Sequence, residues 1–231
     1  MFGLTVTGED GRTFPLTVFT PDKITRDIVF LHSAADEAED VWTLLADDKP
    51  VLCAVGGIEW NRDLSPWTSP AVFRASPDFS GGADRYLDTL AGHIVPRVVS
   101  AVAEHYEVPA DFRLTLAGYS LAGLFAAYAP YRTGVFTRIA SMSGSMWFDG
   151  FADFAASDAM TALPERAYFS LGDREKKARD PRMATVADRT AEVVDVYRGR
   201  GIATEYVSEA GGHFTDVPAR IARGIAAVLE K

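Results

Sequence analysis

Six short apolar runs recur along the chain, with room for a helix between them, and this order constrains the fold more than any other feature. The runs are almost continuously apolar, as in strands that are buried on both faces of a sheet. Buried strands that alternate with helices predict a mostly parallel sheet with right-handed crossovers and helices on both faces. The runs are DIVFLH from Asp27, VLCAVGGI from Val51, FRLTLAG from Phe112, RIASMSG from Arg138, RAYFSLG from Arg166 and ATEYVSEAG from Ala203.

Other segments extend this α/β pattern at both ends and in the middle. Asp10-Gly11 separates GLTVT from TFPLTVF, and a turn dipeptide between β-rich runs predicts an N-terminal antiparallel hairpin. A long helix is predicted from about Gly81, kinked by Pro96, and another helix closes the chain. Their apolar stripes are Leu87, Leu90, Ile94, Val98 and Val102 in the first, and Val217, Ile221, Ile225 and Val228 in the second.

The length of the chain favours one domain. A chain of 231 residues is long enough to bury a large core without disulfides or metals. It contains no repeat or linker that would divide it, so residues 1–231 are expected to form a single domain. The least regular part, from Glu59 to Gly82, is rich in Pro, Ser and Trp and is expected to be a long functional loop.

Charge and cysteine content argue against several classes of function. A formal net charge of −9 disfavours nucleic acid as a partner, because phosphate binding needs clustered Lys and Arg. Cys53 is the single cysteine, so the chain has no intramolecular disulfide or cysteine-based zinc cluster. The N-terminus lacks a signal-peptide pattern, and no run reaches the roughly eighteen apolar residues of a membrane span. We therefore expect a cytoplasmic protein with no membrane partner.

The most informative short motif lies where a predicted strand meets a helix. GYSLA, from Gly118 to Ala122, nearly fits G-x-S-x-G, the sharp turn that exposes a nucleophilic serine, here Ser120. Alanine replaces the second glycine, but it is the next smallest residue and Gly123 follows it, so we expect the turn to form. The alternative is that Ser120 only caps the helix, a position that serine favours.

A serine nucleophile needs a general base, and four histidines compete for this role. His93 and His105 fall within the long predicted helix, where packing or surface roles are expected. His32 ends the first parallel strand, and the loop after that strand is expected to supply an oxyanion donor. His213 lies in a glycine-containing loop between the last strand and the last helix, so we predict that it is the base. A purely structural loop histidine is the alternative.

The base needs an acid that orients its ring, and the chain order Ser, acid, His places this acid between positions 120 and 213. Glu175 is preferred because it comes three residues after Gly172, the glycine that ends RAYFSLG. Asp173 is a close second, and Asp149 is a third option because it follows RIASMSG. The identity of the acid therefore stays open.

Two backbone N–H groups are expected to stabilise an oxyanion, each contributing about 3 kcal/mol in a typical acyl-transfer site. The N–H of Leu121 should be one, because Leu121 follows the serine at a helix N-terminus. The other should come from the loop after DIVFLH, where Ser33, Ala34 and Ala35 are candidates and Ala34 is preferred.

These motifs resemble the "putative esterase" family of α/β-hydrolases, which includes siderophore esterases, feruloyl esterases, S-formylglutathione hydrolases and mycolyltransferases. The resemblance extends over most of the chain from about Phe30 and implies an α/β-hydrolase fold with Ser120 as nucleophile and His213 as base. Members differ at the acid, and the identity of the ester does not transfer. The segments that carry the resemblance are AGYSLAGLFAAYA, FTRIASMSGSMWFDGF, SLGDREKK, GGHFTDVPARIARGI, FSGGADRYLDTLAGHIVPRV and IEWNRDLSPW.

The prediction is a serine carboxylic ester hydrolase that cleaves a small-molecule ester through an acyl-enzyme, with no metal or cofactor. Aromatic residues near the catalytic edge are expected to bind the substrate, together with polar neighbours. The predicted substrate-binding residues are Trp60, Asn61, Asp63, Trp67 and Trp147. The alternatives are an acyltransferase or thioesterase with the same residues, and a catalytically silent hydrolase fold that acts as a binding protein. The sequence does not indicate an oligomeric state.

Overall fold

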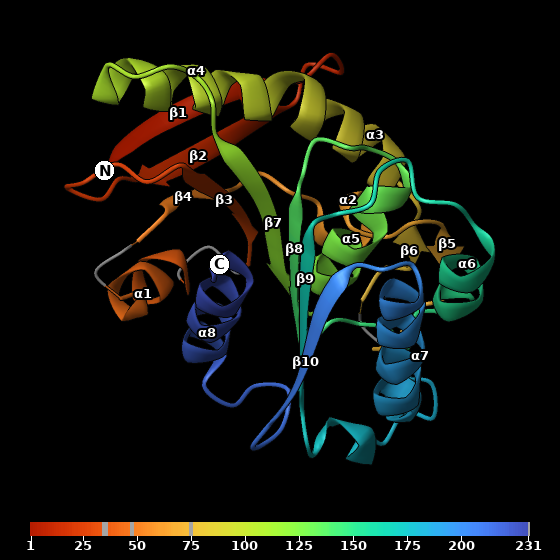
Figure 1. Cartoon of the computed structure of the whole chain (residues 1–231). Coiled ribbons are helices and arrows are strands. Elements are labelled where there is room, and N and C mark those ends of the chain that lie inside the picture. Colours follow the sequence, from red (N-terminus) through yellow and green to blue (C-terminus); the bar gives the residue numbers. More distant parts are fainter. Residues whose placement is uncertain (34–36, 47–48, 74–75, 231) are drawn as a thin grey trace.

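A mixed, mostly parallel sheet of eight strands organises the molecule (Figure 1). The computed structural model describes residues 1–33, 37–46, 49–73 and 76–230. In spatial order the strands are β1 (Phe2–Thr7), β2 (Thr13–Phe19), β4 (Val51–Val55), β3 (Asp27–His32), β7 (Arg113–Tyr119), β8 (Arg138–Met142), β9 (Arg166–Gly172) and β10 (Ala203–Glu209). The six predicted apolar runs form the parallel strands β4, β3, β7, β8, β9 and β10, so this part of the prediction is confirmed.

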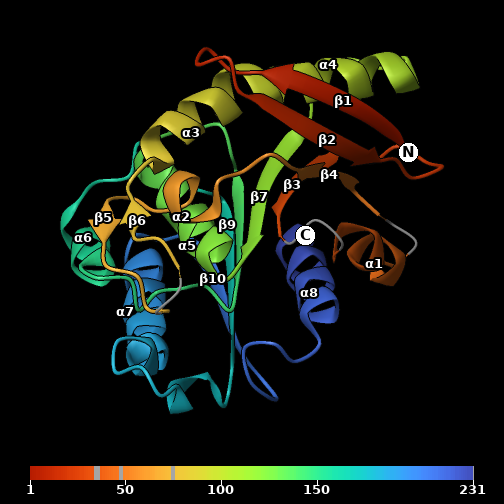
Figure 2. The same ribbon diagram turned by 180° about the vertical axis from the view of Figure 1, so that it is seen from behind.

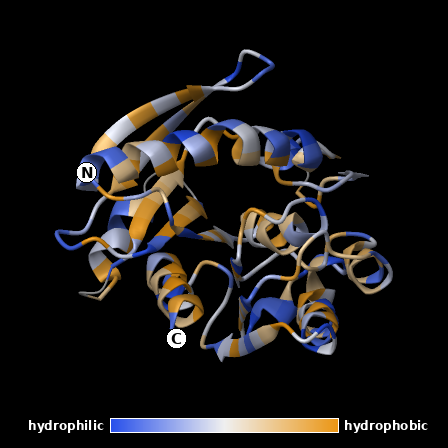
Figure 3. Ribbon diagram, turned by 45° about the horizontal axis from the view of Figure 1, so that its top comes forward, coloured by the Kyte–Doolittle hydropathy of each residue, from blue (hydrophilic) through white to orange (hydrophobic). Residues whose placement is uncertain are grey.

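The N-terminal hairpin is also confirmed. β1 pairs antiparallel with β2, and β2 pairs antiparallel with β4, so the hairpin extends one edge of the parallel sheet. Alternate residues of β2 are buried and exposed, as expected for a strand with one solvated face. Figure 3 shows this alternation of hydrophobic and hydrophilic residues along the hairpin.

Helices cover both faces of the sheet, as predicted (Figures 1 and 2). One face carries α1 (Glu37–Leu44) and α8 (Val217–Leu229), which pack against each other. The other face carries α3 (Ala83–Thr89), α4 (Val95–Tyr106), α5 (Leu121–Tyr128), α6 (Phe151–Ser157) and α7 (Val186–Gly199). Within the described ranges, every helix is too short or too polar to span a bilayer.

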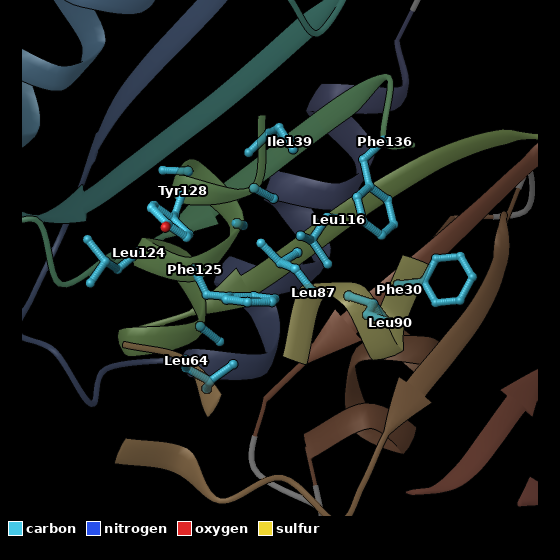
Figure 4. Close-up of a cluster of buried hydrophobic side chains, with 14 of the residues drawn as sticks. Phe30, Leu64, Leu87, Leu90, Leu116, Leu124, Phe125, Tyr128, Phe136 and Ile139 are labelled. Carbon is cyan, nitrogen blue, oxygen red and sulfur yellow. The ribbon is translucent and has the colours of Figure 1, made fainter. Parts of the chain in front are cut away.

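The sheet divides the core into two layers. Because successive side chains of a strand point to opposite faces, Leu116 of β7 packs with α5 whereas Ala117 packs with α8. Burying one Leu or Phe side chain stabilises the fold by about 1.5–3 kcal/mol. Figure 4 shows part of the larger layer, in which Phe30, Leu64, Leu87, Leu90, Leu116, Leu124, Phe125, Tyr128, Phe136 and Ile139 are buried together.

Two regions differ from the sequence-based expectations. The predicted long loop from Glu59 to Gly82 contains the short helix α2 (Trp60–Asp63) and a small hairpin of β5 (Thr68–Ser69) and β6 (Phe79–Ser80). The predicted kink at Pro96 takes the form of a π-helical turn at Leu90–Ile94, after which α4 begins. A proline has no N–H and clashes with the carbonyl four residues earlier, and a widened turn accommodates both constraints.

Strand register brings the carboxyl ends of the parallel strands to one edge of the sheet. His32 of β3 lies opposite Gly118 of β7, and Gly118 lies opposite Ser141 of β8. At the far end, Glu209 of β10 lies opposite Gly172 of β9. Segments that leave β3, β7, β8, β9 and β10 therefore emerge at the same edge, which is where ligands bind in open α/β sheets.

Candidate active site

Ser120 occupies the sharp turn between β7 and α5. Its backbone has φ 59° and ψ −123°, a conformation that a residue with a Cβ rarely adopts. Such strain is typically about 1–3 kcal/mol and persists where the surrounding structure holds it in place. The Ser120 N–H donates to the carbonyl of Met142, and the Ser120 carbonyl accepts hydrogen bonds from the N–H groups of Gly123 and Ser145. The turn is thus fixed to the segment that follows β8.

Glycines are needed on both sides of this turn, but not at position 122. A Cβ on Gly118 would lie 2.3 Å from the carbonyl oxygen of Ala122. A Cβ on Gly123 would lie 2.9 Å from both Ser141 Oγ and the Cα atom of Gly144. Ala122 itself is fully buried without a positive φ. The departure from G-x-S-x-G therefore falls where a methyl group fits.

His213 lies beside Ser120, in the loop between β10 and α8. Its Nε2 atom is 3.0 Å from Ser120 Oγ. The hydroxyl of Tyr119 donates a 2.6 Å hydrogen bond to the backbone carbonyl of His213 and ties the loop to the end of β7. The imidazole is 23 % exposed, so it is accessible from the solvent side.

Glu175 lies behind the imidazole, on a 3₁₀ turn at Glu175–Lys177. Its Oε2 atom is 2.7 Å from His213 Nδ1. Its Oε1 atom accepts hydrogen bonds from Ser143 Oγ at 2.7 Å and from the Gly172 N–H at 2.8 Å. Burial alone would raise the pKa of Glu175, but hydrogen bonds from His213, Ser143 and the Gly172 N–H, with the nearby charge of His213, outweigh it and lower the pKa. The carboxylate is thus held in its charged form.

A buried arginine, Arg220 of α8, adds a positive charge behind this carboxylate. Its side chain is 1 % exposed, and its Nη1 atom lies 3.5 Å from Glu175 Oε1. The same nitrogen donates to Ser143 Oγ at 3.2 Å and to the Tyr119 hydroxyl at 3.3 Å, while Nη2 donates to the carbonyl of Ala210 at 2.8 Å. Arg220 thus joins the turn at Ser120 (the elbow), the turn that carries Glu175 and the loop that carries His213. The sequence analysis missed this residue.

The other two acid candidates lie in different contacts. Asp173 accepts a hydrogen bond from the N–H of Gly211 at 2.9 Å, so it braces the loop that carries His213 without contacting the ring. Asp149 forms an ion pair with Arg182 at 2.8 Å and accepts a hydrogen bond from Ser69. Of the three candidates, only Glu175 lies at hydrogen-bond distance from His213.

The remaining histidines are placed away from Ser120. His32 is fully buried, its Nε2 atom is 2.6 Å from the Tyr86 hydroxyl, and burial lowers its pKa to about 3. His93 lies 3.6 Å from a carboxylate oxygen of Glu9, and His105 packs on Phe2.

The predicted oxyanion donors are only partly described. Leu121 is the first residue of α5, and the N–H groups of a first helical turn have no intrahelical acceptor. Ala34 and Ala35 lie outside the described residues. Ser33, the last described residue before them, borders the cavity at Ser120.

A cavity of about 410 Å³ opens beside Ser120 and His213, and we call it the catalytic cavity. Trp60, a predicted substrate-binding residue, lines it, as do several residues that were not predicted to bind substrate. These additional residues are Ser33, Glu37, Val55, Gly56, Gly57, Ile58, Tyr119, Phe214 and Val217. Phe214 is 87 % exposed and directly follows His213, so its position beside the predicted base was the available signal.

The other predicted substrate-binding residues do not line the catalytic cavity. Asn61 donates a hydrogen bond to the carbonyl of Pro77. Asp63 is 2 % exposed and forms ion pairs with Arg12 at 2.7 Å and with Arg62 at 2.9 Å. Two tryptophans remain: Trp67 packs against Phe148 and Phe154, and Trp147 lines a second cavity that is also bordered by His213. Within the described ranges, no cluster of His, Cys, Asp and Glu side chains is arranged to hold a metal ion.

Comparisons with known proteins bear on the family and the fold of the chain. A family model described as "Putative esterase" matches residues 36–215. Among curated proteins, an uncharacterized protein, YbbA of Bacillus subtilis (strain 168), is 22 % identical over 160 residues. This match spans 68 % of the chain and 62 % of YbbA, which is less than two thirds of that relative's length.

Solved structures share the fold over nearly the whole chain. The siderophore hydrolase EstB from Aspergillus nidulans has a TM-score of 0.76 at 20 % identity, covering 99 % of this chain and 95 % of EstB. The enterobactin hydrolase IroE has a TM-score of 0.70 at 16 % identity, covering 100 % of this chain and 95 % of IroE. A ferulic acid esterase has a TM-score of 0.62 at 16 % identity, with coverage of 99 % and 95 %. These likenesses confirm the predicted α/β-hydrolase fold.

Proposed function

The chain belongs to the "Putative esterase" family, and from this membership and the geometry around Ser120 we propose that it is a serine carboxylic ester hydrolase acting on a small-molecule ester. We also propose that residues 1–231 form one catalytic domain, because the sheet takes strands from both ends of the sequence. The observation that carries the proposal is the chain of contacts Ser120 Oγ to His213 Nε2 at 3.0 Å and His213 Nδ1 to Glu175 Oε2 at 2.7 Å.

Acylation follows from these contacts. With the charged Glu175 as acceptor, Nδ1 of His213 carries the proton and Nε2 accepts the proton of the Ser120 hydroxyl as Oγ attacks the ester carbonyl. The tetrahedral intermediate places its negative oxygen near the N–H of Leu121 and the backbone after β3, where Ala34 is the proposed second donor. The imidazolium then protonates the leaving alcohol, and Ser120 is left as an acyl-enzyme.

Deacylation repeats the same proton transfers with water. His213 accepts a proton from a water molecule while the water oxygen attacks the acyl carbon. The imidazolium then returns the proton to Ser120 Oγ as the carboxylic acid product leaves. Glu175 keeps the imidazole oriented and stabilises its positive charge in both halves. Replacing the water by an alcohol would convert the same cycle into acyl transfer.

Ser120→Ala tests the proposal directly. The variant should lose at least about a thousandfold in the hydrolysis of short p-nitrophenyl esters, since residues of such a unit act together. Ser100→Ala, which changes an exposed serine on α4, serves as the matched control. A fluorophosphonate probe should label wild type and S100A but not S120A. Equal turnover by wild type and S120A would refute the proposal.

A further inference from the structure

Two cavities meet at His213. The catalytic cavity contains Ser120 and mostly apolar side chains, among them Val55, Ile58 and Trp60. A second cavity of about 250 Å³, which we call the basic cavity, shares His213 and Phe214 with the first. Side chains that line the basic cavity include Trp147, Arg174, Lys177, Met183, His213 and Phe214.

The basic cavity lies between two segments that hold each other in place. The Arg174 N–H donates to the carbonyl of Gly211 at 3.1 Å, and Asp173 accepts from the Gly211 N–H. Figure 1 shows the segment after β9 beside the loop after β10, at the lower end of the sheet. The cavity therefore lies between two segments that are joined by hydrogen bonds, and not within a single exposed loop.

Positive charge is concentrated at this cavity although the whole chain has a formal net charge of −9. Arg174 and Lys177 line it from the exposed segment that also contains Lys176 and Arg179. Neighbouring Arg182 is neutralised by Asp149 at 2.8 Å. Among the described residues, Arg174 and Lys177 form no ion pair, so their charges are available to a ligand.

One carboxylate, that of Glu175, also borders the basic cavity. Both of its oxygens are already engaged: Oε2 with His213, and Oε1 with Ser143 and the Gly172 N–H. Arg220 lies 3.5 Å from Oε1 and balances its charge from behind. Of the charged side chains that line the cavity, Arg174 and Lys177 are therefore the two whose charge is not already paired among the described residues.

The position of each cavity relative to the reacting atoms assigns the two halves of an ester. The acyl group becomes bonded to Ser120, so it must occupy the cavity that Ser120 lines, and that cavity is apolar. The leaving alcohol must receive a proton from His213, and the basic cavity is lined by His213 but not by Ser120. The alcohol half therefore extends toward Arg174, Lys177 and the ring of Trp147.

On the basis of the proposed esterase function, we propose that the substrate is an ester of an apolar acid with an alcohol that carries a carboxylate or a phosphate, and that Arg174 and Lys177 bind this anionic group. An arginine contributes paired N–H donors and a lysine a point charge, and both suit either oxyanion. Trp147 offers a flat apolar surface to the part of the alcohol that joins the anion to the ester oxygen.

The test compares matched aryl butyrates. 4-Carboxyphenyl butyrate and 4-phosphonooxyphenyl butyrate carry the charge on the alcohol, and 4-carbamoylphenyl butyrate is the neutral reference. Monophenyl adipate, paired with phenyl hexanoate, places the charge on the acyl side. The readout is the ratio of kcat/KM for each anionic ester to kcat/KM for its neutral partner. This ratio in each variant is divided by the ratio in wild type, so that the intrinsic reactivity of the esters cancels.

Arg174→Gln and Lys177→Gln should each lower the ratio for the alcohol-charged esters about twofold to fivefold, as expected for exposed charge pairs. Raising the salt concentration should lower the wild-type ratio in the same direction. Lys176→Gln and Arg179→Gln remove the same charge from the same segment but do not line the cavity, so their ratios should stay at the wild-type value. The larger decrease, for carboxylate or for phosphate, identifies the preferred anion.

Two results would overturn the inference. One is an equal decrease in all four variants, which would show a general charge effect. The other is a ratio that depends on Arg174 and Lys177 for adipate esters and not for alcohol-charged esters. Both leave the proposed function intact as long as S120A is inactive, whereas an active S120A would remove the function itself.

Discussion

The hydroxyl of Tyr119 donates a 2.6 Å hydrogen bond to the backbone carbonyl of His213, so the residue before the candidate nucleophile holds the loop of the candidate base. Tyr119→Phe removes this bond while keeping the ring. Because one hydrogen bond contributes about 0.5–1.5 kcal/mol, kcat for a p-nitrophenyl ester should fall about threefold to tenfold with little change in KM. Steady-state kinetics check this. An unchanged kcat would mean that the loop is held by its other contacts.

The strained backbone of Ser120 predicts a difference between two inactive variants. Glycine adopts φ 59° without the penalty that a Cβ imposes, whereas alanine keeps the strain. After the greater freedom of glycine in the unfolded chain is subtracted, S120G should be more stable than S120A by about 1 kcal/mol, or about 2–4 °C in Tm. Thermal melts of the two proteins provide the measurement. A lower Tm for S120G would contradict the strain.

Glu175 and Asp173 are separated by a pair of isosteric variants. Glu175→Gln keeps the side-chain shape but removes the charge beside His213 Nδ1, so kcat should fall at least about a hundredfold. Asp173→Asn affects only the contact with the Gly211 N–H, so kcat should fall less than about tenfold. The reverse order in a kinetic assay would make Asp173 the acid.

The lowered pKa of Glu175 predicts a pH dependence of stability. A carboxyl whose folded-state pKa lies below its ordinary value of 4.5 stabilises the fold at pH above 4.5, and this contribution is lost as the pH falls through the folded-state pKa. E175Q lacks the titrating group. The free energy of unfolding of wild type minus that of E175Q should therefore decrease as the pH is lowered from about 7 to about 3. Denaturant titrations at several pH values measure it, and a constant difference would contradict it.

Positions 118 and 122 of the elbow should respond differently to a one-carbon change. Gly118→Ala places a Cβ 2.3 Å from the carbonyl oxygen of Ala122, so it should destabilise the fold by more than about 3 kcal/mol. Ala122→Gly restores G-x-S-x-G and should cost only about 1 kcal/mol as a helix glycine. Its kcat/KM should remain within about threefold of wild type. A large kinetic effect at position 122 would show that the methyl group shapes the site.

Much of this molecule follows from its sequence, because local pattern and strand order are sufficient for the sheet. Ser120, Glu175 and His213 each follow a strand whose carboxyl end lies at one edge, so their meeting in space could be inferred from topology alone. Their chemical roles stay predictions. The choice between Glu175 and Asp173 depends on which side chain turns toward the ring, and a sequence does not record that direction.

Side-chain direction also explains the weaker predictions. Asp63 and Trp67 belong to the segment that was expected to bind substrate, yet Asp63 turns inward to Arg12 and Trp67 packs on Phe148. Arg220 was missed although the sequence held a signal for it. The signal is its position between Val217 and Ile221, on the buried stripe of α8. A charged residue in such a stripe needs a buried partner, and Glu175 is that partner here.

The ion pair between Arg12 and Asp63 joins the turn of the N-terminal hairpin to the helix that begins with Trp60. Trp60 forms part of the wall against which the acyl group is proposed to lie. Substitutions near Arg12 that shift α2 are therefore expected to change selectivity for acyl size without altering Ser120, His213 or Glu175. If the proposed esterase activity holds, the β1–β2 turn is a position outside the cavity at which substitutions can change acyl selectivity.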